Sequence, residues 1–409
     1  MAEEFDVVVA GGGHVGLSLA VALKQGDPRL AVALVDPTPP TAVDGRASAI
    51  AAAARRMFER LGVWDEIAPA AQPILDMIVT DSRLDDVVRP VYLTFEGRLD
   101  TGEPFAHMVP NQAMIGALGR AADAAGVVRF VPDRVDDVDL AGDRATVRLG
   151  SGRNLAAGLV CAADGVRSRL RDLVGIGVVR WDYGQSGIVT TIGHARPHDG
   201  RAEEHFLPAG PFAILPLPDD DAGRHRSSLV WTEKTATADR LVKSDPFTFA
   251  LELERRFGHR LGALEVLAPP RAFPLGLTLA RDFVRPRFAL VGDAAHGIHP
   301  IAGQGLNIGL RDVAALAEVI VEARRLGLDP GGIEVLRRYE RWRRFDAFEM
   351  GVVTDVLNRL FSNDLTPLRL LRDVGLGLVD RLDGLKKHFI GEAAGTGGVV
   401  PRLLRGEAI

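Results

Sequence analysis

The hydrophobic pattern of the chain opens with a strand, a helix and a second strand. Residues 5–10 form a short valine-rich run, which is typical of a buried strand. Apolar residues at helical spacing over 15–23 predict a helix, and 30–35 predict another buried strand. This order predicts a β-α-β unit with two parallel strands at the start of the chain.

The pattern changes character twice after this unit. Further strands are expected at 127–131, 138–149 and 159–163. From 186 to 231, β-rich segments alternate with turns that contain proline and glycine. A buried strand at 288–291 and a helix over 305–323 then restore the earlier pattern. The chain is therefore expected to leave a first domain, build a second domain around a sheet, and return to the first.

Composition narrows the class of protein. The 409 residues are 47% hydrophobic and 25% charged, as in a globular protein with two or three domains. A net charge of −5 argues against nucleic acid as a partner. No apolar run reaches the roughly 18 residues of a membrane-spanning helix, and the acidic N-terminus is unlike a secretory signal. The single cysteine, Cys161, is expected to be buried, and this cysteine usage fits a cytoplasmic protein.

A glycine-rich turn follows the first predicted strand. Gly11, Gly13 and Gly16 have the spacing G-x-G-x-x-G between strand and helix, where backbone amides can approach a pyrophosphate closely. Asp36 ends the next strand, 36 − 16 = 20 residues beyond the last glycine, where an acid binds a ribose hydroxyl. An acid here argues against a 2′-phosphate, so the turn is expected to bind FAD or NAD.

Two further strands end in a carboxylate beside a glycine, at Asp164 and at Asp293. Taken alone, Asp164 is equally well explained as a helix N-cap. Arg46, in the loop after Asp36, is by itself typical of a solvated surface group. The roles of Asp164, Asp293 and Arg46 can therefore be assigned only from these residues and the glycine-rich turn taken together.

In combination, these motifs resemble the single-component FAD-dependent aromatic hydroxylases, which have a fold like that of p-hydroxybenzoate hydroxylase. The segment 299–313, HPIAGQGLNIGLRDV, and the tail 358–395 resemble the ubiquinone-biosynthesis branch of that family. The resemblance covers nearly the whole chain, from 5 to about 395. It implies an α/β fold in which a Rossmann-like FAD-binding domain is interleaved with an α+β substrate domain built on a β-sheet, followed by C-terminal helices.

The resemblance also implies domain boundaries. The discontinuous FAD-binding domain is expected at 1–75, 100–178 and 283–345, the β-rich substrate domain at 76–99 and 179–282, and the C-terminal helical region at 346–409.

Individual residues acquire roles from the same resemblance. Gly11, Gly13 and Gly16 would hold the FAD pyrophosphate, Asp36 the adenosine ribose, and Arg46 the ribityl or phosphate region. Asp293 with Gly292 would bind the ribityl chain, Asp164 would support FAD and nicotinamide binding, and Gln112 would begin a helix facing the cofactor. Gly305, Leu306 and Asn307 would open a helix whose positive end stabilises negative charge on the reduced flavin. His14 departs from the family pattern and receives no role.

The implied activity is hydroxylation of an aromatic ring with O2 and FAD. In such enzymes the reduced flavin forms a C4a-hydroperoxide, which transfers an oxygen atom to a phenol. NAD(P)H is the expected electron donor. His296 and His299, with Pro300, are the catalytic candidates; assistance to phenol deprotonation and simple structural hydrogen bonding are the two alternatives for the histidines. No further ligand follows at a suitable spacing, so no metal is expected.

The implied substrate is a polyprenylated phenolic precursor of ubiquinone. Six apolar residues of the β-rich region are expected either to line its pocket or to form the core of the sheet: Phe206, Leu207, Phe212, Ile214, Leu215 and Leu217. In the tail, apolar residues at helical spacing run from Leu368 to Phe389. This face could dock on the body of the protein, a second subunit, the inner membrane or another quinone-biosynthesis protein.

Two other functions stay open from the sequence. One is an FAD monooxygenase of a different phenolic substrate, and the other is a flavin-bearing assembly subunit of a quinone-synthesis complex. A nicotinamide dehydrogenase is disfavoured because no second Rossmann unit follows the first.

Overall fold

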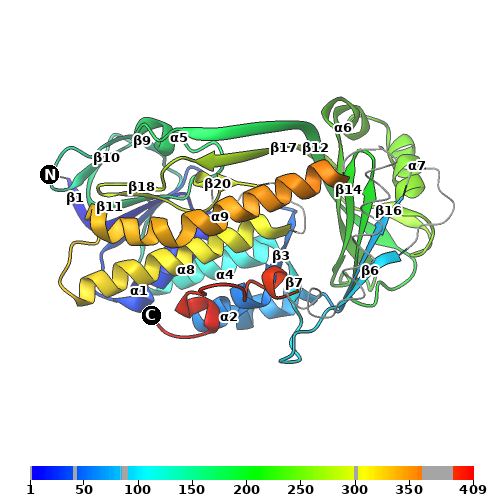
Figure 1. Cartoon of the computed structure of the whole chain (residues 1–409), viewed down its shortest axis with the longest axis horizontal. Coiled ribbons are helices and arrows are strands. Elements are labelled where there is room, and N and C mark those ends of the chain that lie inside the picture. Colours follow the sequence, from blue (N-terminus) through cyan, green and yellow to red (C-terminus); the bar gives the residue numbers. More distant parts are fainter. Residues whose placement is uncertain (1, 40–43, 83, 85–90, 299–302, 362–389) are drawn as a thin grey trace.

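The structure is a computed structural model that describes residues 2–39, 44–82, 84, 91–298, 303–361 and 390–409. Two large β-sheets lie at opposite ends of the molecule, with helices packed along and between them (Figure 1). This mixed architecture confirms the predicted α/β fold with a second domain built on a sheet.

The first sheet has eight strands and contains the predicted β-α-β unit. Its central strand β1 (Glu3–Ala10) pairs in parallel with β2 (Val32–Val35) and with β11 (Asn154–Ala162), and α1 (His14–Gly26) joins β1 to β2. The other strands are β8 (Val128–Phe130), β9 (Val135–Asp139), β10 (Ala145–Leu149), β18 (Val284–Arg285) and β19 (Phe288–Leu290). Cys161 is fully buried in β11, as predicted.

The segment 138–149 differs from the prediction. It contains the end of β9 and the whole of β10, which pair antiparallel, instead of one continuous alternating strand. Gly142 and Asp143 lie between the two strands, and both residue types favour a turn over a pleated strand.

The second sheet has nine strands and is mostly antiparallel. Its strands are β5 (Asp76–Asp81), β6 (Val91–Glu96), β12 (Val178–His194), β13 (Arg201–Leu207), β14 (Gly210–Leu217), β15 (His225–Lys234), β16 (Leu264–Val266), β17 (Arg271–Ala280) and β20 (His296–Gly297). The long strands β12 and β17 run together from the first sheet toward the second (Figure 1). Helices α6 (Thr235–Val242) and α7 (Pro246–Phe257) cover one face of this sheet with an apolar core that includes Trp231 and Phe212.

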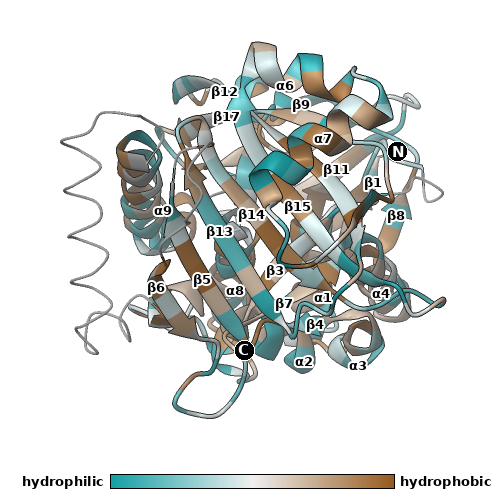
Figure 2. Cartoon of the chain, turned by 90° about the vertical axis from the view of Figure 1, so that its right-hand side faces the viewer, coloured by the Kyte–Doolittle hydropathy of each residue, from teal (hydrophilic) through white to brown (hydrophobic). Residues whose placement is uncertain are grey.

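Chain segments far apart in sequence meet in this second sheet. Strand β5 pairs in parallel with β13, although about 125 residues separate them, as the register of Asp76 with Arg201 shows. Figure 2 shows β5, β13, β14 and β15 side by side, with a hydrophilic stretch of β13 next to the hydrophobic β5. The sheet therefore receives residues that the sequence pattern places in separate regions.

The remaining elements lie around the first sheet. They are β3 (Ala47–Ala51), β4 (Gln72–Pro73), β7 (Ala106–Pro110), α2 (Ala52–Arg60), α3 (Trp64–Ile67), α4 (Asn111–Ala124), α5 (Arg169–Leu173), α8 (Gln304–Arg325), α9 (Ile333–Phe361) and the 3-10 turns η1 (Ala68–Ala70), η2 (Gly292–Ala294) and η4 (Arg402–Arg405). Helix α9 runs as one helix through the predicted boundary at 345 and 346. Within the part of the chain that is described, no helix has the length and apolarity needed to cross a membrane.

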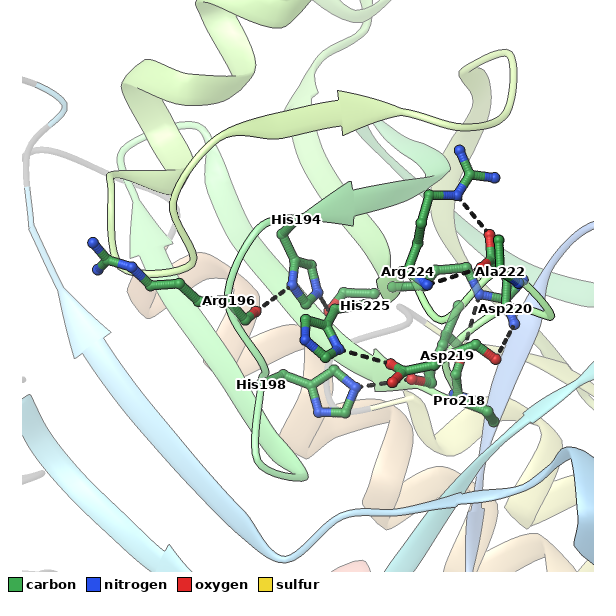
Figure 3. A network of polar contacts seen from close by, with 12 residues as sticks. His194, Arg196, His198, Pro218, Asp219, Asp220, Ala222, Arg224 and His225 are labelled. Atoms are coloured by element: carbon green, nitrogen blue, oxygen red, sulfur yellow. Dashed lines mark hydrogen bonds and ion pairs between the residues drawn. The ribbon is translucent and has the colours of Figure 1, made fainter.

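A polar cluster holds two loops where β12 ends and β15 begins (Figure 3). The ring of His194 contacts the backbone oxygen of Arg196 at 2.7 Å and Oγ of Ser227 at 3.0 Å. His198 contacts the backbone oxygen of Leu217 at 2.8 Å, and His225 lies 3.0 Å from Asp219. Two of these four ring contacts are with backbone oxygens and two are with side chains of nearby residues. The cluster therefore holds the two loops in place.

Candidate active site

A cavity of about 480 Å³ lies between the first sheet and the second sheet. Its walls come from the turn before α1, the loop before β3, the start of α8, and one face of strands β13, β14 and β15. A cavity bounded by two domains is a common place for cofactor and substrate to meet.

The three fingerprint glycines have different surroundings. Gly11 has φ +112°, and a Cβ there would lie 2.2 Å from the backbone oxygen of Ala163. A Cβ on Gly16 would lie 1.9 Å from the backbone oxygen of Gly11. By contrast, a Cβ on Gly13 would meet no atom within 4 Å, and Gly13 lines the cavity. Gly11 and Gly16 therefore permit close packing, and Gly13 leaves open space where a ligand can approach the backbone.

Asp36 lies at the end of β2, against this glycine turn. Its carboxylate accepts hydrogen bonds from the backbone N–H groups of Gly12 and of Thr38, the latter at 2.6 Å. It is not among the residues that line the cavity. The carboxylate therefore stands beside the turn, as a ribose-binding acid would.

Arg46 reaches the cavity as part of a polar network. Its guanidinium donates to Asp44 through Nε and Nη2, both at 2.8 Å, and lies 5.3 Å from the centre of the Phe273 ring. Asn111, at the start of α4, donates to Asp44 at 2.8 Å and accepts from Ser48 at 2.8 Å. Burial raises the pKa of Asp44, but the hydrogen bonds from Arg46 and Asn111 outweigh this and lower it to about 2. Asp44 thus holds Arg46 toward the cavity as a fixed cation.

Two neighbours of this network correct details of the sequence interpretation. Gln112 is exposed, accepts a hydrogen bond from the backbone of Asp44 at 3.3 Å, and is not among the residues lining the cavity. His14, which received no role, does line the cavity and contacts the backbone oxygen of Asn111 at 3.3 Å. Burial lowers the pKa of His14, so its ring is held neutral at physiological pH. No motif in the sequence pointed to Asn111, Asp44 or Ser48, because their roles arise from contacts across the chain.

The two strand-end carboxylates have unused oxygens. Asp164 accepts from the backbone N–H of Leu170 at 3.2 Å through Oδ2, whereas its buried Oδ1 has no partner among the described residues. Asp293 lines the cavity and is exposed to it. Withdrawal of water by the surrounding protein raises the pKa of Asp293, and the charges of His296 and Arg46 oppose this shift. Gly292 beside it has φ +63° and packs closely on Val15 of α1.

Helix α8 begins at the cavity. Its N-cap residue Gly303 is left-handed with φ +65°, and a Cβ on Gly305 would meet no atom within 4 Å. Leu306 and Asn307 also line the cavity. The side chain of Asn307 accepts from the backbone of Ala51 and donates to that of Ala49, both at 2.9 Å. Asn307 therefore ties the helix start to β3, and the first turn of the helix, whose backbone N–H groups have no partner within the helix, lies at the cavity.

His296 lies away from this cavity. Its ring is 0% exposed, and Nε2 contacts Oδ2 of Asp312 in α8. Asp312 also accepts from Arg343 at 2.8 Å and from the backbone of Gly292 at 2.9 Å. Burial lowers the pKa of His296, but the carboxylate of Asp312 outweighs this and raises it. The geometry favours the structural alternative for His296. His299 and Pro300 lie outside the described residues.

The sheet wall of the cavity separates the two alternatives for the six apolar residues, pocket or sheet core. Of the six predicted apolar residues, only Leu215 lines the cavity. Phe212 and Ile214 point to the opposite face of β14, into the core under α6 and α7. Side chains alternate along a strand, so Pro211, Ala213 and Leu215 form the cavity side instead.

These features fit FAD. Gly13 and Gly305 leave cradles that a side chain would fill. Among the described residues, none hydrogen-bonds the Asp293 carboxylate, which can bind hydroxyl groups, and none pairs with the buried Oδ1 of Asp164. The described residues contain no group of three or more His, Cys, Asp or Glu side chains that could hold a metal ion. A polar wall suited to a flavin nucleotide faces a largely apolar sheet wall, which is the arrangement of a flavoprotein that acts on a hydrophobic substrate.

The comparisons with known proteins agree with this class. The family model described as "FAD binding domain" matches residues 4–347. The chain is 44% identical to the ubiquinone hydroxylase UbiL of Rhodospirillum rubrum, over 98% of this chain and 92% of that protein. It is 36% identical to the 3-demethoxyubiquinol 3-hydroxylase of Escherichia coli, over 95% of this chain and 98% of that protein.

A solved structure shows the same fold. The p-nitrophenol 4-monooxygenase PnpA of Pseudomonas putida matches with a TM-score of 0.80 at 20% identity, over 98% of this chain and 100% of that one. The chain belongs to the family of FAD-dependent hydroxylases of ubiquinone biosynthesis.

Proposed function

We propose that this hydroxylase adds oxygen to the ring of a polyprenylated phenolic precursor of ubiquinone, using FAD, O2 and a reduced nicotinamide. The observation that supports this most is the continuous cavity, which has polar residues for FAD at one end and an apolar sheet face at the other. Such a cavity can hold the ring beside the cofactor while excluding water.

The residues of the polar end divide the work of holding FAD. Gly13 and Gly16 form the turn for the pyrophosphate, Asp36 stands beside the ribose, and Asp293 binds the ribityl hydroxyls. Arg46, fixed by Asp44, offers a positive charge to the ribityl or phosphate region. The amides that open α8 would stabilise negative charge at the flavin ring. FAD, when bound, supplies the activation of oxygen that no side chain of the cavity can provide.

Other parts of the proposal concern the wider molecule. The domain division at 1–75, 100–178 and 283–345 for FAD, and 76–99 and 179–282 for substrate, remains our proposal. A prenylated substrate is dissolved in lipid, so the enzyme would take it from the cytoplasmic face of the membrane or from another quinone-biosynthesis protein. Asp164 would contribute to both FAD and nicotinamide binding.

A homologous series of prenylphenols tests the substrate class. Each buried methylene contributes about 0.8 kcal/mol, so affinity should rise steeply with each added isoprene unit. Flavin reduction by NADH and by NADPH, and oxygen uptake, would be measured with each phenol. If affinity and oxygen uptake do not change from a phenol without a tail to one with a long tail, a soluble phenol becomes the proposed substrate. If no phenol stimulates oxygen uptake, the result favours an assembly subunit.

A further inference from the structure

Two acidic residues, Glu203 and Glu204, interrupt the largely apolar sheet wall of the cavity. Glu204 lies in the middle of β13 and lines the cavity, and only 5% of the residue is exposed. Its cross-strand neighbours are Val79 in β5 and Ala213 in β14, and Ala202 and Phe206 precede and follow it on the same face. All four neighbours are apolar, so nothing in the local packing calls for a carboxyl group here.

The adjacent glutamate shows the contrast. The carboxylate of Glu203 pairs with Arg260 and, at 3.5 Å, with His205 two residues along β13, although Glu203 also lies among the residues that line the cavity. Burial raises the pKa of Glu203, but these partners outweigh it and lower the pKa below the ordinary value. Glu203 is therefore a buried ion-pair partner of the usual kind.

Glu204 has no such compensation. Within the described ranges, no hydrogen bond or ion pair reaches its carboxyl group. Burial alone raises the pKa of Glu204 to about 7. An unpaired carboxyl group on a buried apolar face costs stability, and such groups are kept where a ligand uses them.

We propose that Glu204 is the group that binds the phenolic hydroxyl of the ring substrate and accepts its proton during hydroxylation. This inference rests on the proposed function and names the residue that would make the ring reactive. The O–H bond of the phenol breaks, a new O–H bond forms on a carboxylate oxygen of Glu204, and the electron pair stays on the phenolate oxygen. No electron is transferred in this step, and the proton returns to solvent or product after turnover. A carboxyl group that titrates near neutral pH is suited to this exchange.

Ligand binding tests the inference without turnover. The probes are a 2-prenylphenol and its methyl ether, titrated into the FAD-loaded, oxidised enzyme at pH 8 and at pH 6. In the wild type at pH 8 the phenol should bind about 10- to 100-fold more tightly than the ether, because it donates to a charged acceptor. The ratio should shrink at pH 6, where Glu204 is protonated.

Two substitutions of Glu204 and one control separate the outcomes. In Glu204→Leu the ratio at pH 8 should fall to about one, while the control Glu203→Gln keeps the wild-type ratio. Glu204→Gln keeps the shape and tests the charge: its kcat should fall by about 10²- to 10⁴-fold, and it should lack the rise in rate near pH 7 that we expect of the wild type.

The inference and the proposed function fail in different ways. Retention of the phenol-to-ether ratio in Glu204→Leu, or a wild-type pH profile in Glu204→Gln, would overturn the role of Glu204. Failure of the wild type to bind or hydroxylate any prenylphenol would instead overturn the proposed function.

Discussion

The two walls of the cavity are built in opposite ways. The wall toward the first sheet consists of element ends: the turn after β1, the loop after β19 and the start of α8. It offers backbone amides, open glycines and the carboxylate of Asp293. The wall toward the second sheet consists of the middles of β13, β14 and β15, and its residues are apolar except for Glu203, Glu204 and Thr232. The ends of helices and strands expose backbone N–H and C=O groups that have no partner. In the middle of a strand these groups are hydrogen-bonded to the neighbouring strands, so only side chains can contact a ligand.

This difference predicts a division of labour. Changes in the wall of element ends should affect FAD and leave the ring site intact, and changes in the strand wall should do the reverse. Each experiment below measures both ligands, so that a mixed result would break the comparison.

Gly13→Val should have the largest effect. The added side chain would occupy the open space beside the turn, between the backbone and the pyrophosphate. Gly13 has φ −75° and ψ −174°, which any residue adopts, so the variant should fold. We expect flavin absorbance to be lost from the purified protein while the far-UV circular dichroism stays native. Normal flavin content would contradict the fingerprint interpretation.

Gly11→Ala is the matched control for this variant. Residue 11 has a positive φ, and an added methyl group there would collide with the backbone of Ala163. The variant should therefore lower the stability of the fold and not only the binding of FAD. Loss of FAD in Gly13→Val without loss of stability would therefore separate contact with the cofactor from packing of the turn.

Glu204→Leu should stabilise the protein, which few buried substitutions do. The pKa of Glu204 rises from 4.5 to about 7 on folding, so between these pH values the folded protein holds a proton that the unfolded chain has released. Stability is therefore lost as the pH rises through this range. The difference of 7 − 4.5 = 2.5 units corresponds to a cost of about 3 kcal/mol above pH 7.

Urea unfolding at pH 5 and pH 8 measures this cost. The gain of Glu204→Leu over the wild type should be larger at pH 8 than at pH 5 by about 2.5 kcal/mol, because a small part of the cost is already present at pH 5. Glu203→Gln should instead lower the free energy of unfolding at pH 8, because it removes a carboxylate that is paired with Arg260. A gain from Glu204→Leu that does not change with pH would mean that the carboxyl group is not held near neutral pKa.

The sequence predicted one wall of the cavity much better than the other. Gly13, Asp293 and Gly305 were found because each stands in a short contiguous motif whose spacing reflects a local turn or helix start. Glu204 and Ala213 stand in no motif. Their meaning depends on which face of β13 and β14 turns toward the cavity, and this depends on the pairing of distant strands.

The residues for which the sequence left two interpretations open follow the same logic. Hydrophobicity alone selected Phe212 and Ile214, but both faces of β14 are buried, so apolar character does not distinguish core from cavity. His296 stood close to Asp293 in sequence, yet the turn η2 directs its ring to Asp312 on the far side. The parallel strands of the first sheet and the helices α1 and α8 were predicted to within three residues at each end, except that β11 begins five residues earlier than expected, because their patterns are local and strong.

Asp293→Ala should weaken FAD binding by a moderate amount. It removes a charge-assisted hydrogen bond of about 1.5–3 kcal/mol, so the Kd for FAD should rise by about 10- to 100-fold. Flavin occupancy after dilution and dialysis reports this loss, and reconstitution with excess FAD should restore the phenol-to-ether binding ratio. Full retention of flavin after dialysis would show that Asp293 does not hold the ribityl chain.

Ala213→Leu should have the smallest effect and is confined to the strand wall. Ala213 lies beside Glu204 in register and faces the cavity, so a larger side chain would take space from the ring or its tail. We expect about tenfold weaker binding of the prenylphenol, with FAD retained. Ile214→Val, one residue along on the core face, should cost about 0.5–1.5 kcal/mol of stability and leave both ligands unaffected. If Ala213→Leu instead releases FAD, the two walls are not separate, because the space next to Glu204 then belongs to the cofactor.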